Sequence, residues 1–179
     1  MSDGPAELPA GNEIGARIGL VVFDFDGVFT DNTVWTDDTG RESVRCWRGD
    51  GLGLQRLRDL AIPTWVMSTE VNPVVTQRCA KLGIRCRQGL AAKEEALVEV
   101  AADEGVALDS VAYVGNDIND AACLRLAGVP IVVADAHPDV LELAHYRTRT
   151  PGGFGAVREV CDWIAASVRV RGAAGHDPA

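Results

Sequence analysis

Apolar runs of strand length alternate with helical patterns along most of the chain. Residues 18–23 are the first strong signal, an apolar and largely β-branched run that suits a buried strand. Similar runs recur at 62–67, 84–86, 111–114 and 129–133, with amphipathic segments between them. This alternation is typical of a parallel sheet with right-handed crossovers and helices on both faces. The sequence therefore predicts an α/β fold with one Rossmann-like sheet.

The predicted helices follow these strands and end at glycine or in polar segments. Leucines at three- and four-residue spacing in 52–60 predict the first helix. Asn72 and Pro73 supply a helix cap followed by proline at the first helical position, and Gly83 ends that second helix. Further helices are expected at 92–103, 120–127, 138–144 and 156–166, and an edge strand at 146–148.

A β-hairpin is predicted after the first strand. Two β-prone arms, 33–36 and 43–47, flank the turn-forming segment 37–40. The arms carry Trp35 and Trp47, and a two-stranded ribbon is not stable alone in water. We therefore expect the hairpin to pack against another subunit, with packing on its own sheet as the alternative.

Composition and charge narrow the class of protein. The chain has 179 residues, 47% of them apolar, and a net charge of -9. No apolar run approaches the roughly 20 residues that cross a bilayer, and the start of the chain does not resemble a signal peptide. We expect a cytoplasmic protein that binds neither membrane nor nucleic acid. The five cysteines lack close pairing, which favours reduced thiols over zinc or disulfides. The expected division is a flexible leader at 1–16, one domain at 17–166 and a flexible tail at 167–179.

Two carboxylates, Asp24 and Asp26, directly follow the first strand. The carboxyl ends of parallel strands form the edge at which such sheets bind ligands. Side chains two apart on a continuing strand point the same way, so these acids repel each other unless a cation or proton lies between them. Mg²⁺ is the cation that we expect such carboxylate oxygens to bind. The alternative is an Asx turn with both acids in water, although a turn needs only one aspartate.

Polar groups follow three further strands at the same edge: a hydroxyl segment, a lysine and an Asn–Asp cluster. Singly, each has an ordinary explanation: a helix cap for the hydroxyls, a solvated side chain for the lysine and a turn-rich loop for the cluster. Together with a nucleophilic carboxylate, they indicate phosphoryl transfer, in which catalysis is mostly positioning and charge neutralisation. The groups are Ser68, Thr69 and Glu70, then Lys93, and then residues 115–120.

These residues resemble the four motifs of the haloacid dehalogenase superfamily. The resemblance covers about residues 18–165 and implies the fold of that superfamily without a cap domain. It is closest to the branch of the 3-deoxy-manno-octulosonate 8-phosphate phosphatases, the sialic-acid-type 9-phosphate phosphatases and the C-terminal module of CMP-sialic acid synthetases. The segments that carry it are Asp24–Asp31, Asp50–Gly53, Ser68, Lys93, Val111–Asp120, Ala134–Pro138 and Gly152–Asp162.

The resemblance implies a role for each site residue. Asp24 would attack phosphorus and form an aspartyl-phosphate, and Asp26 would act as general acid and base while its backbone carbonyl holds Mg²⁺. Ser68 and Lys93 would hold the phosphoryl oxygens. The expected metal ligands are Asp24, Asp26, Asn116, Asp117 and Asp120, and the expected substrate-binding residues are Thr69, Glu70, Arg48, Asp50, Gly51 and Arg78.

Because of three departures from the family pattern, the sequence does not determine which sugar phosphate is the substrate. Asn116 stands where the family commonly has aspartate, which should weaken Mg²⁺ binding, with Asp117 or Asp120 as alternative ligands. Glu70 falls in the segment where the octulosonate phosphatases have Gly-Arg and the sialic-type phosphatases have glutamate. An acid cannot pair with a sugar carboxylate as arginine would. Arg48 is displaced by one position from the octulosonate pattern.

The sequence thus predicts a Mg²⁺-dependent phosphatase for a sugar-acid phosphate, of the octulosonate 8-phosphate or nonulosonate 9-phosphate type. Without a cap domain, a lone subunit would leave the phosphoryl site open to water, so we expect a homotetramer in which a neighbour completes the site. One alternative is a non-catalytic oligomerisation or regulatory partner in a CMP-sugar-acid synthetase pathway, which Asn116 keeps open. Another is a response-regulator receiver, against which the hairpin and the segment around Gly152 argue.

Overall fold

The computed structural model describes the backbone of residues 6–9 and 11–174. Within this part of the chain, seven strands form one sheet in the order β1-β9-β8-β7-β2-β5-β6, and every neighbouring pair is parallel. The parallel sheet predicted from the sequence is therefore confirmed. The strands are β1 (Ala6–Glu7), β2 (Leu20–Phe23), β5 (Thr64–Met67), β6 (Arg85–Arg87), β7 (Val111–Gly115), β8 (Val129–Val132) and β9 (Tyr146–Arg147).

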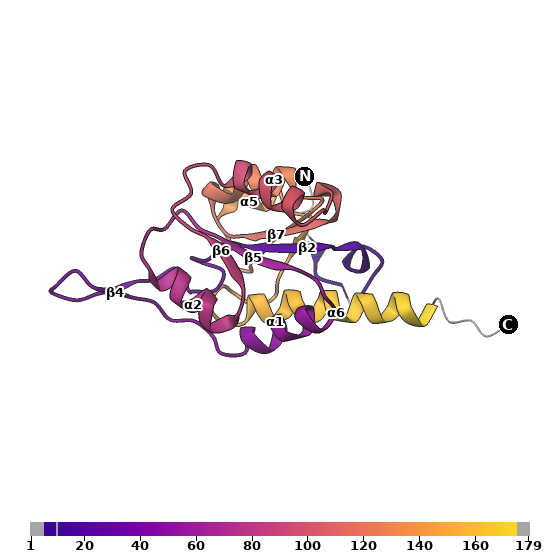
Figure 1. The fold of residues 1–179 in the computed structure, drawn as a ribbon, viewed down its shortest axis with the longest axis horizontal. Helices are drawn as coiled ribbons and strands as arrows, with labels where there is room; N and C mark the ends of the chain where they lie inside the picture. The colour runs from indigo at the N-terminus through magenta and orange to yellow at the C-terminus, as the bar shows by residue number, and fades with distance from the viewer. Residues whose placement is uncertain (1–5, 10, 175–179) are drawn as a thin grey trace.

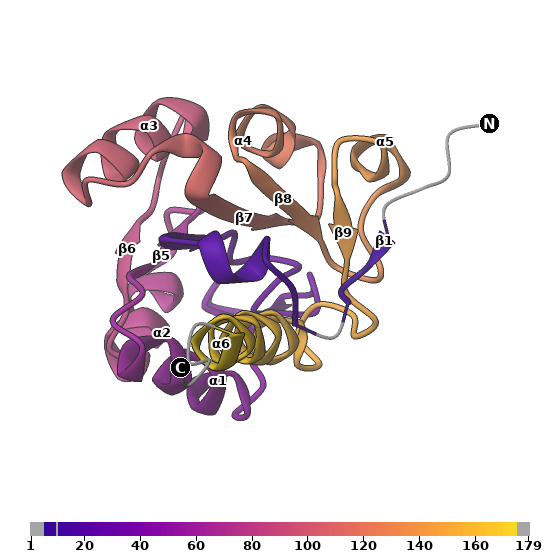
Figure 2. The same ribbon diagram turned by 90° about the vertical axis from the view of Figure 1, so that its right-hand side faces the viewer.

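Helices cover both faces of this sheet, as predicted. Figure 2 shows α3, α4 and α5 on one face and α1, α2 and α6 on the other. No helix in the described part of the chain is long and apolar enough to cross a membrane. The helices are α1 (Asp50–Asp59), α2 (Val74–Leu82), α3 (Lys93–Asp103), α4 (Ala121–Leu126), α5 (Pro138–Leu141) and α6 (Ala156–Ala174), with 3-10 turns η1 (Gly15–Arg17), η2 (Leu108–Ser110) and η3 (Ile118–Asp120).

Strand β2 lies at the centre of the core and determines where the site opens. It pairs with β7 on one side and β5 on the other, and all four of its residues are fully buried. Burial on both faces explains why this strand is a continuous apolar run rather than an alternating one. Phe23 packs edge-on against Phe29, and Phe25 stacks on the same ring. The first polar residue after the strand, Asp24, therefore emerges at the middle of the sheet's carboxyl edge.

The predicted hairpin is present; its outer part leaves the body of the molecule, whereas Val44 and Cys46 at its base pack against the core. Its strands, β3 (Trp35–Thr36) and β4 (Glu42–Ser43), are antiparallel and extend away from the body of the molecule (Figure 1). The side chain of Trp35 is 73% exposed and that of Trp47 is 43% exposed. Trp35 therefore does not fill the edge of its own core, whereas the Trp47 ring lies against Gly155 of the same subunit.

Both ends of the domain differ from the sequence-based expectation. Strand β1 pairs with β9, so β9 is an inner strand rather than the predicted edge strand. Leu8 is buried, and the Asn12 N–H donates to Ser167 Oγ at 3.0 Å. Residues 6–9 and 11–16 are therefore part of the fold, whereas the rest of the expected leader lies outside the described residues. Likewise α6 continues to Ala174, well into the expected tail.

Candidate active site

The chain turns sharply after β2, and this turn orients the two aspartates. The strand ends at Phe23, and the Phe29 N–H donates to the Phe25 carbonyl at 2.9 Å. The spacing of a continuing strand therefore does not determine the direction of Asp24 and Asp26, contrary to the expectation. Gly27 completes the turn with φ of 78°, and a Cβ there would overlap the Asn116 side chain. Both aspartates nevertheless line one pocket.

A buried charge cluster joins the ends of β2, α3 and η3. Lys93 Nζ lies 2.7 Å from Asp24 Oδ1 and 2.9 Å from Asp120 Oδ1. Asp120 Oδ1 also accepts a hydrogen bond from the Tyr113 hydroxyl at 2.7 Å, while Oδ2 accepts the Asn116 N–H at 2.8 Å. Lys93 is 2% exposed and Asp120 is fully buried, so Lys93 is not the solvated lysine of the alternative interpretation.

The electrostatics of this cluster follow from two carboxylates sharing one ammonium. Burial raises the pKa of Asp24 to about 8; the charge of Asp120 adds to the rise, and Lys93 opposes it. Burial lowers the pKa of Lys93, but Asp24 and Asp120 outweigh it, so that pKa is raised overall. Lys93 therefore stays charged, and the three groups prefer to hold a proton or bind a further cation.

Asp26 has surroundings that suit a proton donor. It is half-buried, and burial followed by the charge of Glu70 raises its pKa. The Thr30 hydroxyl lies 3.4 Å from Asp26 Oδ1 and accepts the Gly27 N–H at 3.1 Å. The turn that contains Asp26 is also connected to the segment before α6, because the Gly153 N–H donates to the Val28 carbonyl at 3.1 Å.

Asn116 places its side-chain amide between the two aspartates. One end of the amide lies 2.9 Å from the Asp26 carbonyl oxygen and 3.3 Å from Asp24 Oδ2. Both neighbours are acceptors, so in the protein without a cation this end is the nitrogen, which donates to both. The amide is 6% exposed and thus belongs to the buried wall of the site.

The same three groups fit a hard divalent cation. With its oxygen in that position, Asn116 would bring an amide, a carbonyl and a carboxylate oxygen together. Neighbouring ligands of octahedral Mg²⁺, bound at about 2.0–2.1 Å, lie roughly 3 Å apart, which matches these separations. No cluster of three His, Cys, Asp or Glu side chains that could hold a metal occurs in the part of the chain that the structure describes. This oxygen set relies instead on a backbone carbonyl and an amide.

The two other expected ligands differ from each other. Asp117 lines the pocket, and its Oδ1 accepts the Ile118 N–H at 2.7 Å. Asp120 does not line the pocket, because both of its oxygens accept hydrogen bonds from Lys93, Tyr113 and backbone N–H groups. In this structure the Asp120 oxygens thus contact Lys93 and the loop of Asn116, and direct binding of a metal by Asp120 stays a prediction.

The pocket at the strand ends has a volume of about 340 Å³. Ser68 is 2% exposed, and its Oγ accepts the Glu70 N–H at 3.0 Å, so it also stabilises the loop after β5. The structure thus brings most of the predicted catalytic and metal residues to one place. The lining is Asp24, Asp26, Asn32, Ser68, Thr69, Asn116, Asp117, Ile118 and Asn119.

A second pocket of about 250 Å³ shares Asp26 and Asn32 with the first. Glu70 Oε1 accepts the N–H groups of Val71 and Asn72, and the Asn72 amide donates to Glu42 Oε2 at 3.0 Å. The base of the hairpin thereby forms one wall of this pocket. Several residues of this pocket were not predicted from the sequence. Asn32 had one signal in the sequence, because it directly follows the motif Asp24–Asp31. Its φ is 60°, a value that asparagine tolerates. The lining is Asp26, Asn32, Thr33, Val34, Glu42, Val44, Glu70, Asn72 and Val74.

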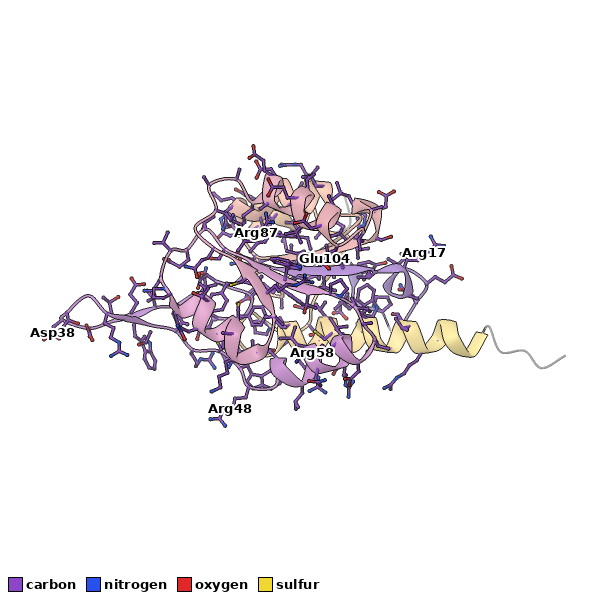
Figure 3. The ribbon with its side chains drawn as sticks, viewed as in Figure 1. Arg17, Asp38, Arg48, Arg58, Arg87 and Glu104 are labelled. Carbon is purple, nitrogen blue, oxygen red and sulfur yellow. The ribbon has the colours of Figure 1, made fainter. Side chains whose placement is uncertain are left out.

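Four expected substrate-binding residues, Arg48, Asp50, Gly51 and Arg78, line neither pocket. Arg48 points into solvent at the surface of the molecule (Figure 3). Asp50 Oδ1 accepts the Arg158 N–H at 3.2 Å, and Arg78 donates to the Trp47 carbonyl at 3.0 Å. Within one subunit, Asp50 therefore contacts α6 and Arg78 contacts the segment before α1, and their binding to a substrate stays a prediction.

Comparison with known proteins agrees with this geometry. The family profile of the haloacid dehalogenase-like hydrolases matches residues 88–159. The 3-deoxy-D-manno-octulosonate 8-phosphate phosphatase KdsC of Escherichia coli (strain K12) is 36% identical over 149 residues, which span 83% of this chain and 79% of that protein. The chain belongs to the haloacid dehalogenase-like hydrolases. Its curated relatives in this family are phosphatases, and it is accordingly a phosphatase, which decides against the receiver and the non-catalytic partner.

Solved structures of haloacid dehalogenase-like phosphatases share the whole fold. The 3-deoxy-D-manno-octulosonate 8-phosphate phosphatase of Yersinia pestis is 35% identical with a TM-score of 0.84, covering 89% of this chain and 87% of that one. The enzyme of the same name from Moraxella catarrhalis, in complex with a magnesium ion, a phosphate ion and a KDO molecule, is 31% identical. Its TM-score is 0.83, and the match covers 91% of this chain and 96% of that one. The family's dependence on metal agrees with the oxygen set around Asn116.

Proposed function

We propose that this phosphatase hydrolyses the phosphate monoester of a sugar acid, that Mg²⁺ is its cofactor, and that the reaction passes through an aspartyl-phosphate on Asp24. The observation that carries the mechanism is the pairing of buried Asp24 with Lys93 at 2.7 Å, beside the more exposed Asp26. A charged lysine next to the attacking carboxylate also lies next to the phosphoryl group that this carboxylate acquires.

The first step forms one bond and breaks one. An oxygen of Asp24 attacks phosphorus, and the bond from phosphorus to the sugar oxygen breaks. Asp26, whose pKa is raised by burial and by Glu70, gives its proton to the leaving oxygen. In the second step Asp26, now ionised, takes a proton from water as the water oxygen attacks phosphorus. The bond from phosphorus to the Asp24 oxygen breaks, which releases inorganic phosphate and restores the Asp24 carboxylate.

The remaining groups stabilise the negative charge of the phosphoryl oxygens. In this proposal Lys93 and Ser68 bind them, supported by the contact of Lys93 with Asp24 and by the hold of Asp120 and Tyr113 on Lys93. Bound Mg²⁺ supplies further charge neutralisation. Its ligands from this chain would be Asp24, the Asp26 carbonyl and Asn116, with Asp117 at the edge of the pocket.

The substrate class rests on the relatives. The octulosonate 8-phosphate phosphatases in this comparison are named for a sugar-acid phosphate, and we propose an octulosonate 8-phosphate or a nonulosonate 9-phosphate type of substrate. The described walls of both pockets contain no Lys, Arg or His side chain, so one subunit offers no ion-pair partner to the sugar carboxylate. We therefore propose that a neighbouring subunit of a homotetramer completes the site, and that the exposed hairpin forms the contact.

A substrate screen tests this function. Purified protein is incubated with octulosonate 8-phosphate, nonulosonate 9-phosphates and neutral sugar phosphates, with Mg²⁺ or with EDTA, and released phosphate is measured. We expect turnover of a sugar-acid phosphate that requires Mg²⁺. Turnover that persists in EDTA would contradict the metal, and a preference for neutral sugars would contradict the substrate class.

A further inference from the structure

We propose that the Asn116 amide has two working orientations. In the metal-free protein its nitrogen takes the place of the cation and donates to the Asp26 carbonyl and to Asp24 Oδ2. When a divalent cation binds, the amide turns over and presents its oxygen. This inference rests on the proposed function only for the existence of the metal site; it adds how this chain keeps that site folded without metal.

The hydrogen bonds around Asp24 and Asp26 call for a donor at this position. Oδ1 of Asp24 already accepts from Lys93 and from the Phe25 N–H, at 2.7 Å each, so in the ionised Asp24 the donor for Oδ2 comes from Asn116. A buried carboxylate oxygen without a donor is costly, and so is a buried carbonyl. One NH₂ group satisfies both acceptors at 3.3 and 2.9 Å. The Asn116 amide therefore satisfies the hydrogen bonding of these two oxygens in the metal-free site, while the excess negative charge of the cluster remains.

The backbone contacts of Asn116 fix its position but still allow its side-chain amide to turn. The Asn116 N–H donates to Asp120 Oδ2 at 2.8 Å, and its carbonyl accepts the His137 N–H at 2.8 Å. The side chain lies against Gly27, where a Cβ would overlap it. The backbone is thus held on both sides, and the amide cannot move away. Rotation about its terminal bond remains, and a half turn exchanges the donor for an acceptor in nearly the same volume.

The net charge of the buried cluster also favours asparagine at position 116. Lys93 is shared by Asp24 and Asp120, so the buried cluster already has one more carboxylate than ammonium. An aspartate at position 116 would add a further negative charge that faces two acceptors, and only a cation or a proton would relieve the repulsion. Asparagine avoids this, so the metal-free protein keeps its stability. The consequence is weaker binding of Mg²⁺, because fewer ligand charges hold it.

Asn116→Asp tests the charge argument, with Asn119→Asp as the matched control. Asn119 lies in the same loop and lines the same pocket, but it is exposed. We expect Asn116→Asp to bind Mg²⁺ about tenfold more tightly by calorimetry. Its melting temperature in EDTA should be lower than that of the unmodified protein, and added Mg²⁺ should raise this temperature by more. The control should change neither the melting temperature in EDTA nor the Mg²⁺ affinity by a comparable amount.

Nuclear magnetic resonance tests the two orientations in the unmodified protein, even if Asn116→Asp does not fold. With asparagine labelled by ¹⁵N, the side-chain NH₂ of Asn116 should exchange slowly with solvent in EDTA, because it is buried and donates twice. Titration with Mg²⁺ should remove that protection and shift the resonance. An Asn116 amide that is unprotected in EDTA, or one that Mg²⁺ leaves unchanged while Mg²⁺-dependent turnover is normal, would overturn the inference and leave the proposed function intact.

The proposed function fails in a different way. Absence of both Mg²⁺ binding and phosphate release in the unmodified protein and in Asn116→Asp would contradict the metal site itself. Equal Mg²⁺ affinity and equal EDTA melting temperatures for the unmodified protein and Asn116→Asp, with normal turnover, would contradict only the role of Asn116.

Discussion

Asp24 and Asp26 are two residues apart but lie in different surroundings, which suits them to different roles. Asp24 is 2% exposed and contacts Lys93, whereas Asp26 opens to both pockets and has no lysine partner among the described residues. A carboxylate held beside an ammonium is oriented for attack. Burial raises the pKa of both carboxyl groups, so it is the greater exposure of Asp26 to the pockets that suits it to deliver a proton to the leaving group.

Asp24→Asn should abolish turnover, because an amide is a very poor nucleophile towards phosphorus. The variant should stay folded, since Lys93 keeps Asp120 as its partner and the repulsion between Asp24 and Asp120 disappears. In EDTA we expect a melting temperature equal to or above that of the unmodified protein. Phosphate release and thermal melting are the measurements. More than a trace of Mg²⁺-dependent activity would contradict the nucleophile, and a clear fall in melting temperature would reveal a structural role.

At the scale of elements, Asp50 connects α1 with α6. It is the first residue of α1, and its Oδ1 accepts the N–H of Arg158 in the first turn of α6. An acceptor near a helix N-terminus stabilises the helix. Asp50 Oδ2, however, accepts no hydrogen bond from any described residue, and the carboxyl is fully buried. Burial raises the pKa of Asp50 to about 7, although Arg158 and Arg78 oppose the rise.

This pKa predicts how stability depends on pH. Because the folded pKa lies above the ordinary value of 3.8, the folded protein binds more protons than the unfolded chain between about pH 4 and pH 7. The contribution of Asp50 to the free energy of unfolding therefore falls as pH rises through that window, by about 1.4 kcal/mol for each unit of separation. Above pH 7 the contribution stays constant.

Asp50→Asn should remove this dependence while keeping an acceptor for the Arg158 N–H. Relative to the unmodified protein, the variant should gain stability steadily from pH 4 to pH 7 and keep a constant advantage above pH 7. Urea unfolding at several pH values measures the difference between the two proteins, so that other titrating groups cancel. Two curves that run parallel from pH 4 to pH 8 would show that the Asp50 carboxyl is not protonated in the folded state.

At the scale of the whole molecule, the hairpin is the part that depends most on a partner subunit in the proposed assembly. It extends from the body, and its strands pair only with each other (Figure 1). Its base is nonetheless joined to the site, since Glu42 accepts from Asn72 beside the second pocket. A partner that packs on Trp35 would therefore also act on the pocket wall. This connection links the proposed assembly to activity.

Trp35→Glu should dissociate the assembly and lower activity together, because a charge in an apolar contact is costly. Val98→Glu is the control, since it adds the same charge at another exposed apolar side chain, on α3. Light scattering and phosphate release are measured on both variants. An unmodified protein that is monomeric at micromolar concentration, or a monomeric Trp35→Glu with full activity, would contradict the proposed tetramer.

The sequence by itself determined the sheet, the helices and the place of the chemistry. Apolar periodicity reports burial within a single element, so β2, β7 and β8 could be predicted from their continuous runs. Residues that follow parallel strands lie at one edge of the sheet. The proximity of Asp24, Ser68 and Lys93 could therefore be predicted from the sequence.

Only the tertiary structure decided which distant groups touch. Strand β1 has two residues and no periodic pattern, and it exists because β9 offers an edge to pair with. Asp120 is one of the ligands predicted from the sequence, but in the structure its oxygens accept hydrogen bonds from Lys93 and Tyr113. The direction of the Asn116 amide likewise depends on the turn after β2. Such contacts depend on the path of the chain in space, which local patterns of apolar and polar residues do not determine.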